Sequence, residues 1–407
     1  MGKPTGFLEY ARQGNPCQPP LERVAYWNEF HPRLGREERQ RQGARCMACG
    51  VPFCQSGAVL NGMVSGCPLH NLVPEWNDLV YRRKLGRALE RLLKTNDFPE
   101  FTGRVCPALC EAACTCGLNG QPVTVKDNEL GIIEEAWEQG LMSPRPPETR
   151  TGRTVAVVGS GPASLTCASD LAKHGYEVTI FEAFHTAGGV LVYGIPEFRL
   201  PKAIVQNEVD KLTALGVDLE TDMVIGKTFD IDEMFEEGYE AVFIGSGAGL
   251  PMFMGIEGET LAGVYSANEY LTRINLMKAY REGYDTPLKI SGSAAIIGGG
   301  NVAMDAARCA KRMGAEHVYV LYRRDEEEMP ARKEEVHHAK EEGIEFMLLT
   351  NPVKVLDDGT GRVGGLECVK MRLTAPDESG RRAPKVVEGS NFTLEVDTVV
   401  MSLGTSP

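Results

Sequence analysis

The sequence lacks the features that would direct a protein to a membrane or to nucleic acid. None of its 407 residues belong to an apolar run of about 18, so no membrane-spanning helix is expected. Residues 1–10 lack the apolar core of a signal peptide, and Gly6 stands where myristoylation needs Ser or Thr. Basic residues are outnumbered, and the net charge of −13 disfavours nucleic acid. We therefore expect a cytoplasmic protein with no membrane and no nucleic acid among its partners.

The sequence also lacks short-period repeats, low-complexity tracts and any convincing triad or carboxylate pair for acid–base catalysis. The adjacent histidines His337 and His338 are predicted to lie on a solvated helix surface. What the chain has instead is 12 cysteines, which in a reducing compartment indicate metal or redox chemistry more than disulfides. It also has two glycine-rich loops of the kind that bind nucleotides.

The order of these features predicts three segments. Short helical patterns, such as 76–93, fill the cysteine-rich first part, which ends at a Pro-rich linker over 143–147. Strand and helix patterns alternate afterwards, which predicts an α/β fold with two Rossmann-like domains in tandem. The predicted boundaries are 1–147 for a helical domain, 152–286 for the first nucleotide domain (with 396–407 beginning its return segment) and 287–395 for the second.

The first glycine-rich loop joins a predicted strand, 154–158, to a predicted helix, 163–174, and a second strand follows at 177–181. Such a turn lets the backbone approach a pyrophosphate, which the helix N-terminus binds through its N–H groups. Glu182 ends the second strand, and a carboxylate there suits the ribose of FAD or NAD. The predicted binding residues of this loop are Gly159, Ser160, Gly161, Pro162 and Ala163. The alternative is a plain turn that enters a helix.

The second glycine-rich loop repeats the design with strands at 293–297 and 317–322 and a helix at 302–313. Its second strand is followed by Arg323 and Arg324, whose guanidinium groups match a 2′-phosphate in charge and geometry. We therefore predict FAD at the first loop and NADPH at the second. The predicted loop residues are Gly298, Gly299, Gly300, Asn301 and Val302. The alternative is that the two arginines form surface ion pairs with the acids at 325–328.

Eight cysteines cluster ahead of both loops, at positions 46, 49, 54, 67, 106, 110, 114 and 116. Two thiolate-bound [4Fe–4S] clusters need about eight ligands. A structural zinc site favours paired CxxC units, but only Cys46 and Cys49 form one, and Cys67 and Cys106 precede prolines as in ferredoxin-like sequences. The pattern favours iron–sulfur clusters, with zinc or inert buried cysteines as the alternatives.

Together these motifs resemble the family of small (β) subunits of NADPH-dependent glutamate synthase, over essentially the whole chain. The wider family includes the electron-entry half of dihydropyrimidine dehydrogenase and the large subunit of the bifurcating NADH-dependent ferredoxin:NADP oxidoreductase. The opening segment favours glutamate synthase among these. The segments that carry the resemblance are 1–10, 44–54, 66–78, 98–107, 193–200 and 322–325.

The resemblance implies two [4Fe–4S] clusters with interleaved ligands. One set would be Cys46, Cys49, Cys54 and Cys114. The other would be Cys67, Cys106, Cys110 and the carboxylate of Glu129. Two departures stand out, because the stretch 55–66 is inserted before Cys67 and Cys116 is a spare thiol that could compete as a ligand. For Glu129, a solvated carboxylate near a helix start is the alternative.

The resemblance also implies nucleotide contacts. The flavin would be contacted by Gly188 and Gly189, which follow Glu182, and by Arg199. NADPH would be contacted by Gly300, Asn301, Val302, Arg323, Arg324 and Arg332.

The function implied is electron input: NADPH is oxidised at FAD, and electrons pass through the clusters to a large subunit that makes glutamate from glutamine and 2-oxoglutarate. The cofactors supply the chemistry, so no catalytic side chain is expected. The alternatives are a related oxidoreductase with another partner and a non-enzymatic iron–sulfur protein.

The last residues, 397–407, form an apolar strand that enters a glycine turn. The resembled family continues beyond this point with a Gly-Asp motif near the flavin and a closing helix. We therefore expect the sequence to be a fragment of a longer protein, with FAD held weakly or not at all. The alternative is a natural short variant whose partner completes the domain.

Overall fold

The computed structural model describes residues 2–60, 63–288, 292–377, 380 and 382–407. The chain forms two compact units. Unit 1 consists of Met1–Gln18, Glu29–Ala187 and Lys202–Gly245. Unit 2 consists of Pro19–Asn28, Gly188–Pro201 and Ser246–Pro407.

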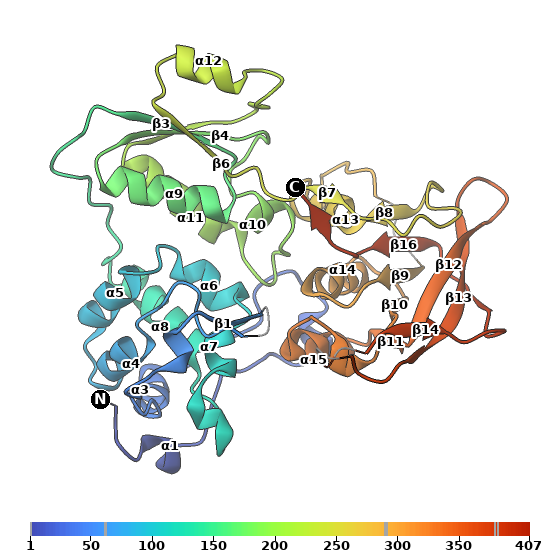
Figure 1. Ribbon diagram of the computed structural model, residues 1–407, viewed down its shortest axis with the longest axis horizontal. Helices are drawn as coiled ribbons and strands as arrows, with labels where there is room; N and C mark the ends of the chain where they lie inside the picture. The colour runs from blue at the N-terminus through green and yellow to red at the C-terminus, as the bar shows by residue number, and fades with distance from the viewer. Residues whose placement is uncertain (1, 61–62, 289–291, 378–379, 381) are drawn as a thin grey trace. The chain divides into compact units, whose positions relative to one another are not determined.

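The first part of unit 1, up to residue 142, is the helical subdomain (Figure 1). Its central helix, α8 (Val125–Glu138), packs against five others and buries side chains all round its circumference. Trp76, Leu92, Ile132 and Ile133 form the middle of its core and are almost fully inaccessible. The other helices are α1 (Gly6–Glu9), α3 (Arg36–Ala44), α4 (Val73–Tyr81), α5 (Leu85–Leu93), α6 (Pro99–Val105) and α7 (Leu109–Ala112), with single turns at Phe53–Gln55 and Thr115–Leu118.

Helix α6 lies unusually close to α8. A Cβ atom built on Gly103 would lie 2.9 Å from the Cβ of Leu130, so a larger residue at 103 would push the two helices apart. This close approach brings the end of α6, which leads into Cys106, next to Glu129 of α8. The core packing of the helical subdomain therefore sets the position of two of the predicted ligands.

The helical subdomain departs from the all-helical expectation at one place. Strands β1 (Ala58–Leu60) and β2 (Met63–Ser65) pair in antiparallel fashion within the inserted stretch between Cys54 and Cys67. Ala58, Val59 and Leu60 form a short β-favouring run. Val59 and Leu60 are both exposed.

The second part of unit 1, residues 150–187 and 202–245, is the first Rossmann subdomain. Its parallel sheet has the order β5-β4-β3-β6, with β3 (Thr154–Val158) and β4 (Glu177–Phe181) at the positions predicted from sequence. In Figure 1, helices α9 (Pro162–Lys173) and α11 (Lys202–Ala214) lie on the face of this sheet that is turned to the helical subdomain. The remaining elements are β5 (Val217–Glu220), α12 (Ile231–Glu236) and β6 (Ala241–Ile244).

Unit 2 contains the second Rossmann-like sheet, a parallel sheet of order β11-β10-β9-β16-β8. Strands β9 (Ser293–Ile297) and β10 (His317–Tyr322) match the sequence prediction, and α14 (Asn301–Arg312) follows the glycine loop. The α/β class with tandem Rossmann-like domains is thus confirmed. The other elements around this sheet are α10 (Val190–Tyr193), β8 (Val264–Ser266), α13 (Ala267–Asn275), α15 (Lys333–Glu341), β11 (Glu345–Leu348) and β16 (Thr398–Met401).

The structure differs from the sequence prediction in where residues 246–286 and 396–407 belong. Strand β8 and helix α13 pack with the second sheet, not the first. Strand β16, predicted to begin a return to the first domain, pairs with β9 and β8 in the second sheet. The physical reason is burial, since all four residues of β16 are buried between its two neighbouring strands.

The rest of unit 2 is an antiparallel sheet built on β12 (Thr350–Asp357) and β13 (Val363–Leu373). Strands β14 (Pro384–Val386) and β15 (Phe392–Leu394) pair with β13, and β7 (Leu250–Pro251) pairs with β17 (Thr405–Ser406). Helix α2 (Pro20–Arg23) also belongs to this unit. The prediction of a solvated His337-His338 pair is wrong for His338, which is 2% exposed because it lies on the inner face of α15.

Among the described helices, none has both the length and the apolar character needed to cross a bilayer.

Candidate functional site

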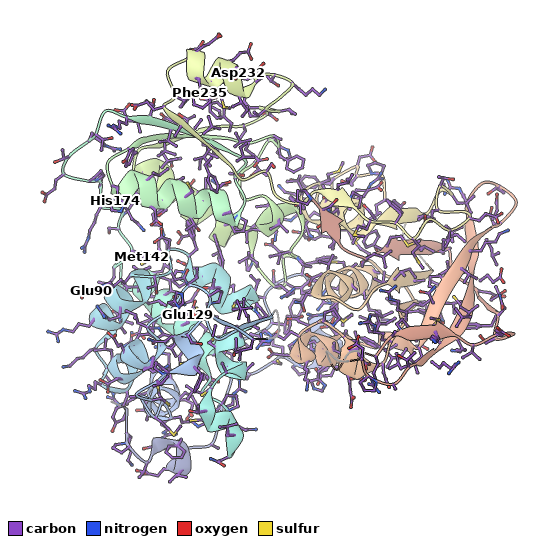
Figure 2. The ribbon with its side chains drawn as sticks, in the orientation of Figure 1. Glu90, Glu129, Met142, His174, Asp232 and Phe235 are labelled. Carbon is purple, nitrogen blue, oxygen red and sulfur yellow. The ribbon has the colours of Figure 1, made fainter. Side chains whose placement is uncertain are left out.

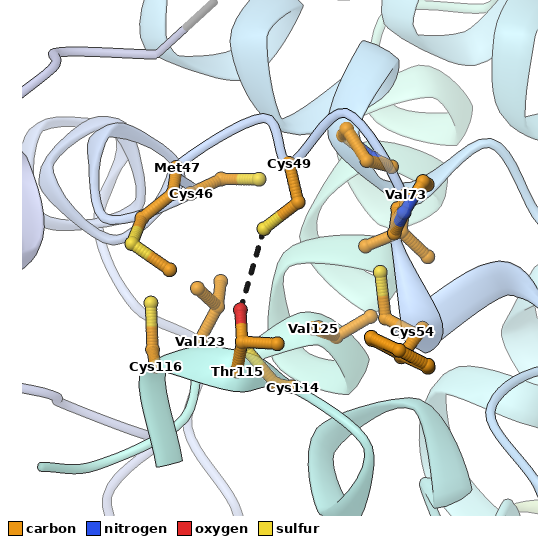
Figure 3. Close-up of a pocket in the computed structure, with 13 residues that line it drawn as sticks. Cys46, Met47, Cys49, Cys54, Val73, Cys114, Thr115, Cys116, Val123 and Val125 are labelled. Carbon is orange, nitrogen blue, oxygen red and sulfur yellow. Dashed lines mark hydrogen bonds between the residues drawn. The ribbon is translucent and has the colours of Figure 1, made fainter. Parts of the chain in front are cut away.

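The first predicted ligand set lies around one cavity in the helical subdomain (Figure 3). Cys46 and Cys49 follow α3, Cys54 lies in the turn Phe53–Gln55, and Cys114 lies just before the turn Thr115–Leu118. The rest of the lining is mostly apolar, from Val73, Val123, Val125 and the Pro52-Phe53 pair. Four thiols around a cavity with apolar walls fit an iron–sulfur cluster, whose inorganic core needs thiolate ligands and exclusion of water.

The spare thiol lines the same cavity. Cys116 donates a weak hydrogen bond of 3.7 Å from its sulfur to the carbonyl oxygen of Arg45. The neighbouring Cys116 thiol lowers the pKa of Cys114 to about 6, whereas burial raises the pKa values of Cys46 and Cys54 to about 11 and about 12. Cys49 lies 3.3 Å from the hydroxyl of Thr115, the contact drawn in Figure 3. Cys114 and Cys116 both line the cavity, and the lowered pKa of Cys114 favours its thiolate form.

The second predicted ligand set gathers around α6, α7 and α8. Burial raises the pKa values of its three thiols, Cys67, Cys106 and Cys110. The nearby carboxylate of Glu129 raises each of these pKa values further. The groups that act on the Cys110 thiol are Glu111, Glu129, Cys106 and Cys67. The structure thus brings these three thiols and Glu129 together, and the backbone N–H of Cys67 donates to the carbonyl oxygen of Cys54 in the first set at 2.7 Å.

Glu129 is buried, with 6% of its surface exposed, so a solvated carboxylate is excluded (Figure 2). Burial raises its pKa to about 7. Asn96 donates a hydrogen bond of 3.0 Å from Nδ2 to Glu129 Oε1, and the Thr102 hydroxyl donates to the same oxygen. Both hydrogen bonds are on Oε1, so Oε2 is the oxygen that is available as a ligand for iron.

The first glycine loop of unit 1 adopts the form that nucleotide binding requires. Gly159 has a φ of 89°, a left-handed conformation that favours glycine. A Cβ atom built on Gly161 would meet nothing within 4 Å, so the backbone at the start of α9 is open to a ligand. Glu182 accepts hydrogen bonds from the Ser160 N–H, 2.9 Å away, and from the Ser160 hydroxyl. These features fit a pyrophosphate at the helix N-terminus beside a ribose-binding carboxylate.

The other predicted flavin contacts lie in unit 2. Gly188 and Gly189 have φ values of 121° and 54°, and they lead into α10. Arg199 was predicted to contact the flavin, but in unit 2 its Nη1 donates to both carboxylate oxygens of Asp305, at 2.8 Å each. It also lies 3.4 Å from Glu335. Arg199 is thus tied to α14 by Asp305 and to α15 by Glu335.

The second glycine loop lines a cavity of about 720 Å³ in unit 2. Gly300 precedes α14, and a Cβ atom built on it would meet nothing within 4 Å. The ring of Tyr322 packs under Gly299, where a Cβ atom would come within 2.7 Å of it. Arg323 lines this cavity together with Asn301 and Val302. The cavity therefore offers a glycine turn, a helix N-terminus and one guanidinium group, which suits NADPH.

The acids after the second strand do not neutralise Arg323. Asp325 caps the following turn, and Glu326 pairs with Lys340 at 2.6 Å. Glu327 and Glu328 both pair with Arg382. Among the described residues, no ion pair involves Arg323 or Arg324. The predicted alternative, surface ion pairs between these arginines and the acids, is therefore not found.

The two further arginines are placed less favourably than Arg323. Arg324 and Arg332 do not line the cavity. The Arg332 backbone N–H donates to the Asn301 side chain at 2.9 Å, and its guanidinium pairs with Glu334 at 2.7 Å. Arg332 therefore supports the glycine loop through its backbone, while its charge is engaged elsewhere.

A buried ion-pair cluster anchors α14, the helix behind this loop. The carboxylate of Glu342 accepts hydrogen bonds from Arg23, Arg308 and Arg312, at distances between 2.7 and 3.2 Å. The side chains of Glu342, Arg308 and Arg312 are fully inaccessible, and that of Arg23 nearly so. The segment Pro19–Asn28 is thereby fastened to α14 and to the residue after α15.

Comparison with known proteins identifies the family. Residues 153–407 match the family model described as pyridine nucleotide-disulphide oxidoreductase, and residues 23–141 match that of dihydropyrimidine dehydrogenase domain II, 4Fe-4S cluster. The glutamate synthase [NADPH] small chain of Escherichia coli K12 is 34% identical over 98% of this chain and 84% of its own length. The chain belongs to the glutamate synthase [NADPH] small-chain family.

Another family member, the glutamate synthase [NADPH] small chain of Bacillus subtilis 168, is 45% identical over 78% of this chain. That match spans 65% of the Bacillus protein, just under two thirds of its length. Among solved structures, Mycobacterium tuberculosis FprA in complex with NADPH matches with a TM-score of 0.52 at 21% identity, covering 64% of this chain and 71% of FprA. This last likeness concerns the fold.

Membership of the small-chain family makes the protein an NADPH-dependent oxidoreductase that uses FAD and a 4Fe–4S domain. Sequence reasoning identified the candidate cofactor ligands but missed the residues that orient them. The missed residues are Asn96 and Thr102 at Glu129, Thr115 at Cys49, Tyr322 under Gly299, and Asp305 at Arg199. One signal was available for Thr102, a polar residue just ahead of Cys106 in the segment 98–107 that already carried the family resemblance. Asn96 lies outside that segment.

Proposed function

We propose that this chain is the electron-input subunit of an NADPH-dependent glutamate synthase. Its partner would be a large subunit that makes glutamate from glutamine and 2-oxoglutarate. When bound, FAD and the clusters supply hydride acceptance and single-electron transfer, respectively. One observation carries the proposal. This chain, a member of the small-chain family, combines two glycine loops that open onto helix N-termini with two groups of thiols.

At the second loop, the protein's task is to hold NADPH by its phosphates. The Gly298–Gly300 turn admits a pyrophosphate, and the N-terminus of α14 offers it N–H groups and a favourable dipole. Arg323 is the charged residue of the cavity lining, and it supplies the cation for a 2′-phosphate. Arg324 and Arg332 would act at longer range, by support of the loop and of the local positive potential.

At the first loop, Glu182 would accept hydrogen bonds from ribose hydroxyls, while Ser160 fixes its orientation. At the thiol groups, the ligand sets that we propose remain Cys46, Cys49, Cys54 and Cys114, and Cys67, Cys106, Cys110 and Glu129. Burial raises the pKa of most of these thiols, so a positive iron centre is the natural way to keep them deprotonated. We propose two clusters on this basis.

The test is purification of the chain without oxygen, alone and together with the candidate large subunit from the same genome. With FAD added, we expect flavin bleaching by NADPH, iron and sulfide contents near eight each, and glutamine-dependent glutamate formation only when the large subunit is present. A chain that bleaches with NADPH but supports ferredoxin or pyrimidine reduction instead would assign it to a related oxidoreductase. A preparation that contains zinc only would overturn the iron–sulfur assignment.

A further inference from the structure

The segment 96–102 of unit 1 faces two different neighbours. Asn96 and Thr102, at its ends, donate hydrogen bonds to Glu129. Asp97 and Glu100, between them, face helices α9 and α11 of the first Rossmann subdomain. One short segment therefore contacts both the carboxylate at the second thiol group and the subdomain that carries the first glycine loop.

The contact between Glu100 and α11 pairs two carboxyl groups. Glu208 of α11 is 0% exposed and Glu100 of α6 is 1% exposed, and their side chains lie within hydrogen-bonding reach of each other. Oε1 of Glu208 and Oε2 of Glu100 are buried without a hydrogen-bond donor among the described residues, while Oε2 of Glu208 faces Nζ of Lys211. Two ionised carboxylates in such a place would repel each other with little water to screen them. A proton between them removes that conflict and supplies the missing donor.

The charged and polar groups around Glu208 are consistent with one proton shared between Glu100 and Glu208. Lys211, on the same helix, forms an ion pair with Glu208, and its Nζ lies 5.5 Å and 5.9 Å from the ring centres of Phe98 and Trp137. From α8, the indole N–H of Trp137 donates to Oε1 of Glu100. With one shared proton the two acids carry one negative charge, which Lys211 balances. Loss of that proton would leave a net negative charge in a site closed to water, at high cost.

A second pair of the same design lies nearby. Asp97 and Asp170 of α9 face each other, and Lys173, three residues beyond Asp170, lies 2.5 Å from Asp97. Lys211 likewise follows Glu208 by three residues. The Asp97–Asp170 pair is more exposed than the Glu100–Glu208 pair, because Asp170 lies at the surface. Solvent therefore screens it, and the buried pair is the one that constrains the contact.

The predicted charge states agree with this geometry. Burial and the charge of Glu100 together raise the pKa of Glu208 to about 9, although Lys211 opposes both. A carboxyl group with that pKa keeps its proton at neutral pH in the folded protein. In the unfolded chain it loses the proton near its ordinary pKa of about 4.3.

We propose that Glu208 is a positioning residue: it shares one proton with Glu100, and this proton holds the first Rossmann subdomain on the segment that orients Glu129. The same proton thereby keeps the predicted flavin site and the second thiol group in register. A folded protein that binds a proton released on unfolding is destabilised as pH rises. The stabilisation is complete below the unfolded pKa and is lost as pH rises through the folded pKa.

The first test is thermal unfolding of the full chain at a series of pH values, comparing wild type with Glu208→Gln. The amide keeps the shape and a donor toward Glu100 but cannot ionise. We expect the melting temperature of wild type to fall as pH rises from neutral through about 9, the value near which the Glu208 pKa lies, and the melting temperature of Glu208→Gln to fall distinctly less. The matched control is Glu90→Gln, an exposed glutamate of the same subdomain (Figure 2), which should follow wild type. Parallel curves for wild type and Glu208→Gln would overturn the proposal.

The second test needs no change in stability. The infrared spectrum of the folded wild type at neutral pH should show the carbonyl stretch of a protonated carboxylic acid that disappears on titration to alkaline pH. This band should be missing in Glu208→Gln and present in Glu90→Gln. Glu129 has a raised pKa of its own, so the variant Glu129→Gln is measured alongside. This variant should keep the carbonyl band that disappears on titration to alkaline pH. A wild-type spectrum without such a band would show that the two acids hold no proton.

The consequence for electron transfer rests on the proposed function. NADPH-driven reduction of the iron–sulfur signal should slow at alkaline pH in wild type and slow less in Glu208→Gln, while NADPH-driven bleaching of the flavin should respond equally in both. Equal alkaline slowing of the iron–sulfur signal would reject the positioning role. A chain that shows no NADPH oxidation at any pH would reject the proposed function, and the unfolding and infrared results would still decide the shared proton.

Discussion

The amide of Asn96, between α5 and α6, lies 3.0 Å from Oε1 of Glu129 in α8 and donates a hydrogen bond to it. Thr102 donates to the same oxygen. A buried carboxylate with two donors on one oxygen has a fixed orientation, and three thiols lie close to it. This arrangement makes Glu129 the most informative single residue of the predicted ligand sets.

Replacing Glu129 with Ala should alter one cluster and spare the other, because only the second thiol group contains it. The measurement is the electron paramagnetic resonance spectrum of the reduced protein together with its iron content. Asn96→Ala should shift the same signal by a smaller amount, since one of two orienting hydrogen bonds is lost. If the spectra of both clusters are unchanged in Glu129→Ala, the carboxylate is not a ligand.

Replacing Arg323 with Ala should lower the preference for NADPH over NADH about ten- to a hundred-fold. The reason is the loss of a charge-assisted contact, worth roughly 1.5–3 kcal/mol. The ratio of kcat/KM for the two coenzymes measures the effect. Arg324→Ala is the matched comparison and should have a smaller effect, because Arg324 does not line the cavity. A ratio unaltered in the Arg323→Ala, Arg324→Ala double variant would show that neither arginine selects the coenzyme.

Cys114 and Cys116 can be separated by single substitutions. Cys114→Ala should lose one cluster, whereas Cys116→Ala should keep the iron content of wild type. The Cys116 sulfur is directed to the Arg45 carbonyl as a donor, which requires the protonated thiol, and the Cys114 pKa of about 6 favours the thiolate. Iron and sulfide analysis of both variants decides the matter, and the reverse result would make Cys116 the ligand.

Removing the charge of Glu342 should destabilise unit 2 strongly. Glu342→Gln leaves buried arginine charges without a partner, a change that costs about 3–5 kcal/mol in comparable buried pairs. Glu341→Gln is the control, because Glu341 is 33% exposed and pairs with Arg23 alone among these arginines, so its loss should cost about 1 kcal/mol or less. Urea unfolding measures both variants, and equal effects would contradict the importance of the buried cluster.

Glu342 also makes the stability of the folded protein depend on pH in the acid range. Burial acts to raise the pKa of Glu342, but hydrogen bonds from Arg312 and Arg308 outweigh it and hold that pKa far below its usual range. A lowered folded pKa contributes stability above the unfolded pKa, and this stability is lost as pH falls toward the folded value. In wild type this contribution should decline below about pH 4.3, the unfolded pKa, and Glu342→Gln should lack that decline.

Local sequence patterns were sufficient to predict the strands, the glycine loops and the cysteine groups. The four predicted strands of the two glycine-loop units, such as Thr154–Val158 and Ser293–Ile297, lie where the β-favouring runs place them, because a buried parallel strand needs a short apolar run and little else. The glycine loops could be predicted as well, because a turn that admits a phosphate leaves no room for side chains. These features depend on residues adjacent in the chain.

Membership of the small-chain family and the α/β class were therefore determined by sequence alone, but partners distant in the chain were decided by tertiary packing. Strand Thr398–Met401 belongs to the second sheet, because its position between β9 and β8 buries all of its apolar residues. Glu100 and Glu208 lie 108 positions apart, and their pairing exists only because α11 packs on the helical subdomain. A carboxylate's charge state depends on what surrounds it, so no local pattern distinguishes a solvated glutamate from one that shares a proton.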